Sequence, residues 1–211
     1  MKHITCYLDF VSPYAWLALE QMPKALQGLS YHVEYRPVLL GALLQGNANP
    51  GPAGIPAKRL WTYRHATWLG KSLGIGLQMP AQHPFKPTPL LRLALAHGRD
   101  GGINRFVAQA VMQHVWVGGE DANDPQRLQR LRTLLQEQKR YDETGDEAKQ
   151  WLRANTEQAS KAGVFGVPAW EVGGHVFWGL DALPMLRSYL EGDSWFDAHW
   201  QAVAHVESGL I

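Results

Sequence analysis

Cysteine is almost absent from this chain of 211 residues, in which Cys6 is the single thiol. One thiol cannot form an internal disulfide, and it excludes sites that need two cysteines, such as dithiol redox centres and CxxC metal sites. No apolar run comes near the ~18 residues of a membrane-spanning helix, and the first residues, MKHITCYLDF, do not resemble a signal peptide. We therefore expect a cytoplasmic protein without a membrane segment.

A strong net charge is also missing, because 20 Lys and Arg against 19 Asp and Glu leave a charge of +1. No whole-molecule field would attract nucleic acid or an anionic membrane, so we expect neither as a partner. The nine histidines contain no HExxH-type spacing, from which we predict no metal site. A glycine-rich phosphate loop is absent too, since SPYAW stands where GxGxxG would follow a first strand.

The beginning of the chain predicts a βαβ unit. Residues 4–10 read as a strand that stops at Ser12-Pro13, and apolar residues at helical spacing follow as far as Gly28. Residues 31–38 alternate as a second strand. A crossover of this length suits a parallel, right-handed pair.

The end of the chain predicts a hairpin followed by a helix. Residues 169–172 and 175–178 read as strands on either side of Gly173-Gly174, a two-residue turn of the primed type. A helix is expected over 181–191.

The middle of the chain is dominated by helical patterns after a loop rich in glycine and proline at 46–56. We expect helices over 57–73, 87–97, 101–116, 125–136 and 142–161. Because the two terminal pieces are each too small to bury a sheet face alone, the predicted fold is α/β. Residues 1–38 and 162–211 form one sheet domain, which is split by an all-helical insertion domain over 39–161.

Ser12 is the leading candidate for chemistry, and two interpretations stay open. As a helix N-cap it satisfies free backbone donors, with Pro13 at a position that needs no N–H. The same helix terminus carries partial positive charge, so Ser12 could also stabilise a thiolate or another anion brought near it. No base is visibly placed to make Ser12 itself a nucleophile, and Asp9 is expected to face away from Phe10 along the strand.

Three further places are candidates from the residues alone. Val167-Pro168 precedes a strand, and a cis bond there would turn the Val167 backbone outward toward Ser12; the sequence leaves cis and trans open. Asp181 reads as a cap of the last helix or as a carboxylate for a ligand ammonium. Asn49 and Lys58 flank the glycine and proline loop, as solvated surface or as an edge that binds carboxylates.

Several motifs together resemble one family of enzymes. DFVSPYAW near the start, GVFGVPAW and FWGLDALPML near the end, and AKRLW, HPFKP and VWVGGED between them are similar to the 2-hydroxychromene-2-carboxylate isomerases and the related kappa-class glutathione transferases. The resemblance covers nearly the whole chain. It implies a thioredoxin-like domain of the DsbA type with a helical insertion, reduced glutathione as cofactor, and a homodimer.

The resemblance also implies roles for individual residues. Ser12 would be the catalytic residue, replacing the first cysteine of the redox relatives and stabilising the glutathione thiolate. Glutathione would further be held by Asn49, Lys58, Val167, Pro168, Leu180 and Asp181. The substrate, a small aromatic carboxylate, would be held by Phe10, Pro13, Trp61, Phe85 and Lys86. Lys86, Leu180 and His65 depart from the family pattern.

The implied reaction is the isomerisation of 2-hydroxychromene-2-carboxylate, or a related aromatic catabolite, to trans-o-hydroxybenzylidenepyruvate through a reversible glutathione adduct. A kappa-like glutathione transferase or peroxidase is the first alternative and would use the same Ser12. A noncatalytic DsbA-like protein that binds extended peptides is the second. A dithiol oxidoreductase is excluded, because Ser12 and Ala15 stand where its two cysteines would be.

Overall fold

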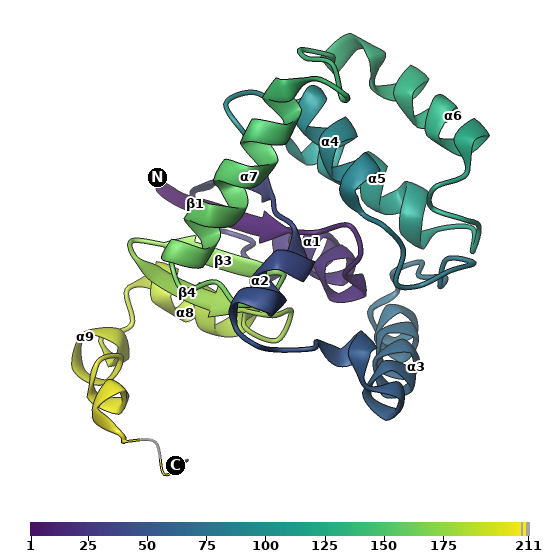
Figure 1. Cartoon of the computed structure of the whole chain (residues 1–211). Helices are drawn as coiled ribbons and strands as arrows, with labels where there is room; N and C mark the ends of the chain where they lie inside the picture. Colours follow the sequence, from purple (N-terminus) through teal and green to yellow (C-terminus); the bar gives the residue numbers. More distant parts are fainter. Residues whose placement is uncertain (208, 210–211) are drawn as a thin grey trace.

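The computed structural model describes residues 1–207 and 209, and the last predicted positions of the sheet domain, 208 and 210–211, lie outside it (Figure 1). Strand β1 (Lys2–Leu8) pairs in parallel with β2 (Tyr31–Pro37). Strands β3 (Ala169–Val172) and β4 (His175–Trp178) form the predicted hairpin. The sheet order is β2-β1-β3-β4. The predicted α/β fold is confirmed.

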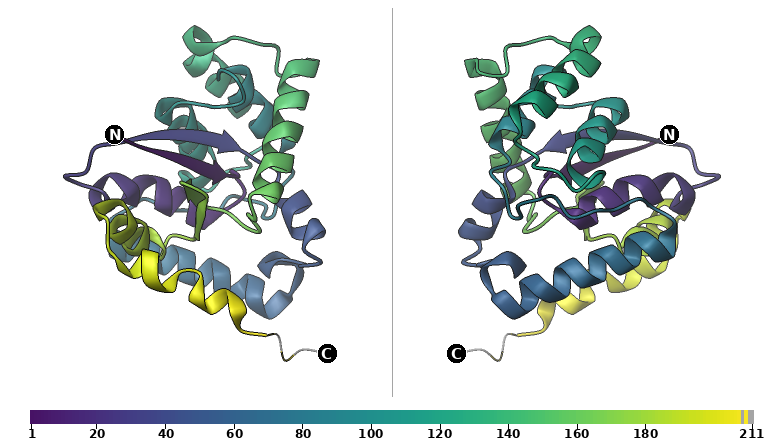
Figure 2. Two further views of the ribbon diagram at one scale, coloured as in Figure 1. Left: turned by 90° about the vertical axis from the view of Figure 1, so that its left-hand side faces the viewer. Right: turned by 90° about the vertical axis from the view of Figure 1, so that its right-hand side faces the viewer.

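The sheet joins the two ends of the chain. Strand β3 pairs antiparallel with β1, with Cys6 opposite Trp170. Helices α1 (Pro13–Ala25) and α8 (Leu183–Glu191) lie on one face of the sheet, and α7 (Asp146–Lys161) lies on the other (Figure 2). Both faces are therefore covered, as the burial of Cys6 and Tyr7, which are neighbours in β1 and point to opposite faces, requires.

All the regular elements between β2 and β3 are helices. The α-helices are α2 (Leu40–Gly46), α3 (Pro56–Leu73), α4 (Thr88–Ala96), α5 (Arg105–Trp116), α6 (Pro125–Leu135) and α7, with 3-10 turns at Pro52–Gly54 and Gln136–Gln138. After α8 come α9 (Trp195–His199) and a 3-10 turn at Ala202–His205. Helix α3 packs against α1, and α4 packs against β2 and α7.

Some boundaries differ from the sequence prediction for local reasons. Helix α5 starts at Arg105 rather than at 101, because Gly101 has a φ of +79° and the Asn104 side chain accepts the Val107 N–H as a cap. The short helices α2 and α9 were not predicted at all. Within the described residues, no helix is both long and apolar enough to cross a bilayer.

Candidate active site at the first helix terminus

Ser12 lies just beyond β1, at the N-cap of α1, with extended backbone angles of φ −94° and ψ 116°. Its Oγ accepts the Ala15 N–H at 3.2 Å, so the predicted cap is present. The same Oγ donates its proton to the Val167 carbonyl, also at 3.2 Å. The side chain is buried, and Pro13 behind it is buried as well. Two segments 155 residues apart therefore meet at this hydroxyl.

The Val167-Pro168 peptide bond is cis, which answers the question that the sequence left open. Val167 is buried and its carbonyl faces Ser12. In the described part of the chain its N–H forms no hydrogen bond. The Pro168 carbonyl accepts the Gly179 N–H at 2.9 Å, which ties this loop to the segment carrying Leu180 and Asp181.

Asp181 does not cap the last helix, so this part of the sequence interpretation was wrong. Helix α8 begins two residues later, with Ala182 at the N-cap and no side-chain cap. The Asp181 carboxylate is exposed. Burial is the largest cause that raises the Tyr14 pKa, and the negative charge of Asp181 is the second. Asp181 thus lies within electrostatic range of Tyr14, in the first turn of α1.

An aromatic row on α3 borders the same turn; of its members, Trp61 was predicted to contact the substrate, and no role was predicted for Trp68. The Tyr14 hydroxyl and His65 Nδ1 are 2.9 Å apart. His65 stacks on Trp61, with ring centroids 5.8 Å apart and planes at 9°, and on Trp68 on its other side. The spacing of 61, 65 and 68 marks one helix face, but only the fold places this face beside Tyr14.

The predicted substrate residues differ in how exposed their side chains are. Phe10 is 0% exposed and offers no surface to a ligand, since it points into the core. Phe85 is nearly as buried, whereas Trp61 is 65% exposed. Lys86 is exposed in the segment before α4. A direct contact between Phe10 and a substrate is therefore excluded in this conformation.

The predicted edge of Asn49 and Lys58 lies in the segment around the start of α3. Asn49 Oδ1 accepts the Gly51 N–H at 2.8 Å, which shapes the loop itself. Lys58 is exposed in the first turn of α3 and forms no ion pair among the described residues. Among the described residues, neither side chain forms a hydrogen bond with Ser12, so their roles stay predictions.

The turn that carries Ser12 is held from two sides. The Asp9 carboxylate is fully buried and accepts the N–H groups of Val11 at 3.2 Å and Leu40 at 2.9 Å. His83 Nε2 lies 2.8 Å from the Val11 carbonyl and donates to it, because a carbonyl can only accept. Burial lowers the His83 pKa, which favours the neutral ring. These contacts fix the backbone from which Ser12 projects.

Asp9 and Phe10 were expected on opposite faces, and both side chains are fully buried. Because helices cover both faces of the sheet, this burial is compatible with the expectation. Phe10 belongs to the core cluster of Ile4, Cys6 and Leu8, whereas the Asp9 carboxylate contacts the Leu40 N–H.

The chemistry that this geometry allows is anion stabilisation. Ser12 supplies a hydroxyl donor at the positive end of α1, where a thiolate gains from both. Among the described residues, no histidine or carboxylate is hydrogen-bonded to Ser12 Oγ, so the activating base of a serine nucleophile is not there. The Val167 N–H is a further polar group, on the residue whose carbonyl Ser12 Oγ contacts.

The sheet order, the cis-proline loop against the first helix and the helical segment between the two halves define a thioredoxin-like protein of the DsbA type. A family model described as the DSBA-like thioredoxin domain matches residues 3–191. The chain belongs to this family.

Curated relatives lie in two groups. The 2-hydroxychromene-2-carboxylate isomerase of Sphingobium xenophagum is 29% identical over 205 residues, which cover 90% of this chain and 98% of the relative. Glutathione S-transferase kappa 1 of Rattus norvegicus is 24% identical, covering 90% of each chain. A solved structure of 2-hydroxychromene-2-carboxylate isomerase superposes with a TM-score of 0.75 at 21% identity, covering 94% of this chain and 98% of that one. The relatives include enzymes named as isomerases and as glutathione transferases.

Proposed function

We propose that the protein is a glutathione-dependent isomerase that converts 2-hydroxychromene-2-carboxylate, or a related aromatic catabolite, to its open-chain trans isomer. The observation that carries the proposal is the meeting of Ser12 Oγ with Val167 at the N-terminus of α1. The relatives with matching names support the class of reaction.

The residues present fit reduced glutathione. An extended peptide needs a backbone donor and acceptor beside it, and Val167 offers its carbonyl together with an N–H that has no partner among residues 1–207 and 209. A γ-glutamyl ammonium needs an anion, and the Asp181 carboxylate is exposed at the loop tied to Pro168. When bound, glutathione would supply a thiolate that adds reversibly to a conjugated carbon, so that the former double bond can rotate.

Ser12 would hold the negative charge of the sulfur. Its Oγ already accepts from the Ala15 N–H, so its single proton is the group that can change partner. The proton turns from the Val167 carbonyl, 3.2 Å away, toward the thiolate, and the α1 terminus adds its partial positive charge. Both effects favour the ionised thiol over the neutral one.

The substrate side would be formed by the row on α3. Trp61 is exposed and stacked on His65, so an aromatic ring can continue the stack. Lys58 or Lys86 would pair with the carboxylate of the substrate. The homodimer implied by the resemblance also stays a prediction.

The test is to incubate the protein with 2-hydroxychromene-2-carboxylate, with and without glutathione, and to follow the ultraviolet spectrum and the free thiol. We expect isomerisation that requires glutathione and leaves its concentration unchanged. The same preparation is assayed with a chloronitroaromatic. Conjugation of that compound without isomerisation of the chromene would mean that the kappa-like transferase is the right function instead.

Asp181→Asn is expected to weaken glutathione binding about tenfold, because a hydrogen bond to a charged group contributes about 1.5 kcal/mol. The ionisation of the bound thiol should not change, since Ser12 is untouched. Titration calorimetry measures the affinity, and thiolate absorbance measures the ionisation.

Cysteinylglycine, which lacks the γ-glutamyl group, is the matched ligand for this variant. Wild type and Asp181→Asn should bind it equally, and the exposed Asp197→Asn serves as a charge control. An equal loss for both ligands would show that Asp181 acts on the fold and not on the γ-glutamyl end.

A further inference from the structure

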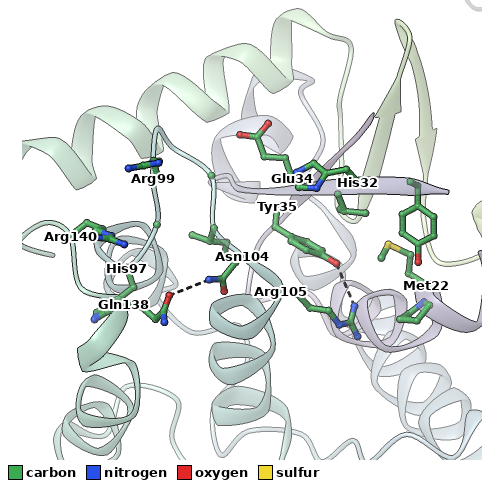
Figure 3. Close-up of a pocket in the computed structure, with 16 residues that line it drawn as sticks. Met22, His32, Glu34, Tyr35, His97, Arg99, Asn104, Arg105, Gln138 and Arg140 are labelled. Carbon is green, nitrogen blue, oxygen red and sulfur yellow. Dashed lines mark hydrogen bonds between the residues drawn. The ribbon is translucent and has the colours of Figure 1, made fainter. Parts of the chain in front are cut away.

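A cavity of about 840 Å³ lies away from Ser12, between β2, the C-terminal end of α1 and the start of α5 (Figure 3). Met22, in its wall, is ten residues from Ser12, which is roughly 15 Å along the helix axis. None of the residues around the thiol site described above lines this cavity. Its volume falls within the range of small-molecule sites.

One wall is a turn that its surroundings hold in a single shape. Gly101 has a φ of +79°, and a side chain there would lie 2.8 Å from Asn155 Oδ1. Asp100 is also left-handed, with a φ of +52°. Asn155 is fully buried and donates to the carbonyls of Gly101 at 2.8 Å and Pro37 at 3.0 Å. The turn therefore presents Arg99 from a fixed backbone.

Arg140, the second arginine at this end of the cavity, is anchored as well. The backbone N–H groups of Arg140 and Tyr141 both donate to the Ala96 carbonyl at the end of α4, at 2.8 and 3.0 Å. Gln138, just before them, accepts from Asn104 at the N-cap of α5. Arg140 thus stands on a segment fastened to two helices.

The charges that line the cavity do not cancel. Arg105 is paired with Glu20 and reaches the Tyr35 hydroxyl, and Glu34 is paired with Arg36 at 2.8 Å. Arg99 and Arg140 form no ion pair within residues 1–207 and 209. Two guanidinium groups remain, which is the donor set that binds a carboxylate or phosphate.

His97 adds an unpartnered atom to this end. It is 4% exposed and lines the cavity, and its Nδ1 donates to the Leu93 carbonyl at 2.7 Å. Its Nε2 is buried with no hydrogen-bond partner in the described part of the chain. Because Nδ1 carries the proton of the neutral ring, Nε2 is an acceptor, and a bound anion would be held by the arginines rather than by this atom.

The other end of the cavity carries apolar side chains beside His32 and Arg105. Figure 3 shows Met22 at the end away from Arg99 and Arg140. Tyr31 and Val33, at the start of β2, belong to the same lining. A ligand that fills the cavity therefore needs a charged head and an apolar body.

We propose that this cavity binds a small organic anion, with its carboxylate or phosphate between Arg99 and Arg140 and a ring-sized apolar body against Met22 and Val33. The site is separate from the thiol site, so its ligand binds whether or not Ser12 is intact.

The probes are phenyl phosphate and benzoate, with inorganic phosphate and phenol as the single halves of the ligand. Calorimetry on the full chain should show that a probe with both parts binds at least tenfold more tightly than either half. Whether phenyl phosphate or benzoate binds more tightly identifies the head group. Arg99→Gln and Arg140→Gln should each weaken binding about tenfold, and the double variant more.

Arg130→Gln, on the exposed face of α6, removes the same charge outside the cavity and should bind like wild type. Ser12→Ala should also bind like wild type. Unchanged binding by the double arginine variant, or no preference for phenyl phosphate or benzoate over the separate halves, would overturn the proposal.

Discussion

Ser12→Ala is expected to lower glutathione-dependent turnover by about 10²–10³-fold. This is the usual loss when one hydrogen-bond donor to a catalytic anion is removed. Alanine keeps the backbone of α1 and its dipole, so part of the thiol activation should survive. The pKa of the bound thiol should rise toward its free value near 8.5. The thiolate absorbance of the complex, followed against pH, measures this shift directly.

The same substitution also removes a helix cap, which costs about 1 kcal/mol of stability and needs its own control. Asp124 is the matched position, because it caps α6 through the Arg127 N–H at 2.8 Å and is likewise followed by proline. Asp124→Ala should lose comparable stability and keep the thiol pKa of wild type. If glutathione bound to Ser12→Ala keeps the same thiol pKa as glutathione bound to wild type, Ser12 acts only as a helix cap.

The parts of the fold that sequence reasoning reached are those with local causes. The hairpin of β3 and β4 was predictable because Gly173 and Gly174 can adopt the positive φ angles of +57° and +81° that its turn requires. Helix α9 was not, because its five residues depend on tertiary contacts. Phe196 packs its ring 6.0 Å from that of Phe177, a contact between distant segments that no local pattern contains.

In the candidate site, too, the features with local causes were predictable from the sequence, and those that depend on the fold were not. The cap at Ser12 follows from Ser-Pro before a helical pattern, and the structure has it. The approach of Val167 joins positions 155 residues apart, and the sequence linked them only on the condition of a cis Val167-Pro168 bond, which it left open. The pair of Tyr14 and His65 had no signal at all, because each residue alone looks like an ordinary member of its helix.

Asp9 connects the site to the stability of the whole fold. Its buried carboxylate holds the N–H of Val11, in the turn before Ser12, and that of Leu40, at the first position of α2. Desolvation by burial raises its pKa from 3.8 to about 7, against the opposing effect of these hydrogen bonds. The native state therefore binds this proton more tightly than the unfolded chain does.

The sign of the pH dependence follows from that difference. Below the unfolded pKa near 4 both states are protonated, and the contribution to stability is complete. As the pH rises from about 4 to about 7 the unfolded chain ionises first, and the free energy of unfolding falls by roughly 4 kcal/mol. Above 7 both states are ionised and this contribution is flat.

Asp9→Asn should remove this slope, because asparagine does not ionise; its single acceptor oxygen for two N–H groups adds a cost in stability that does not depend on pH. Urea unfolding at several pH values between 4 and 8 measures the difference between variant and wild type. That difference should shrink as the pH rises, since only the wild type loses stability through Asp9. Asp146→Asn, with its side chain 82% exposed, should run parallel to wild type. Parallel profiles for Asp9→Asn would mean that the native carboxyl titrates normally.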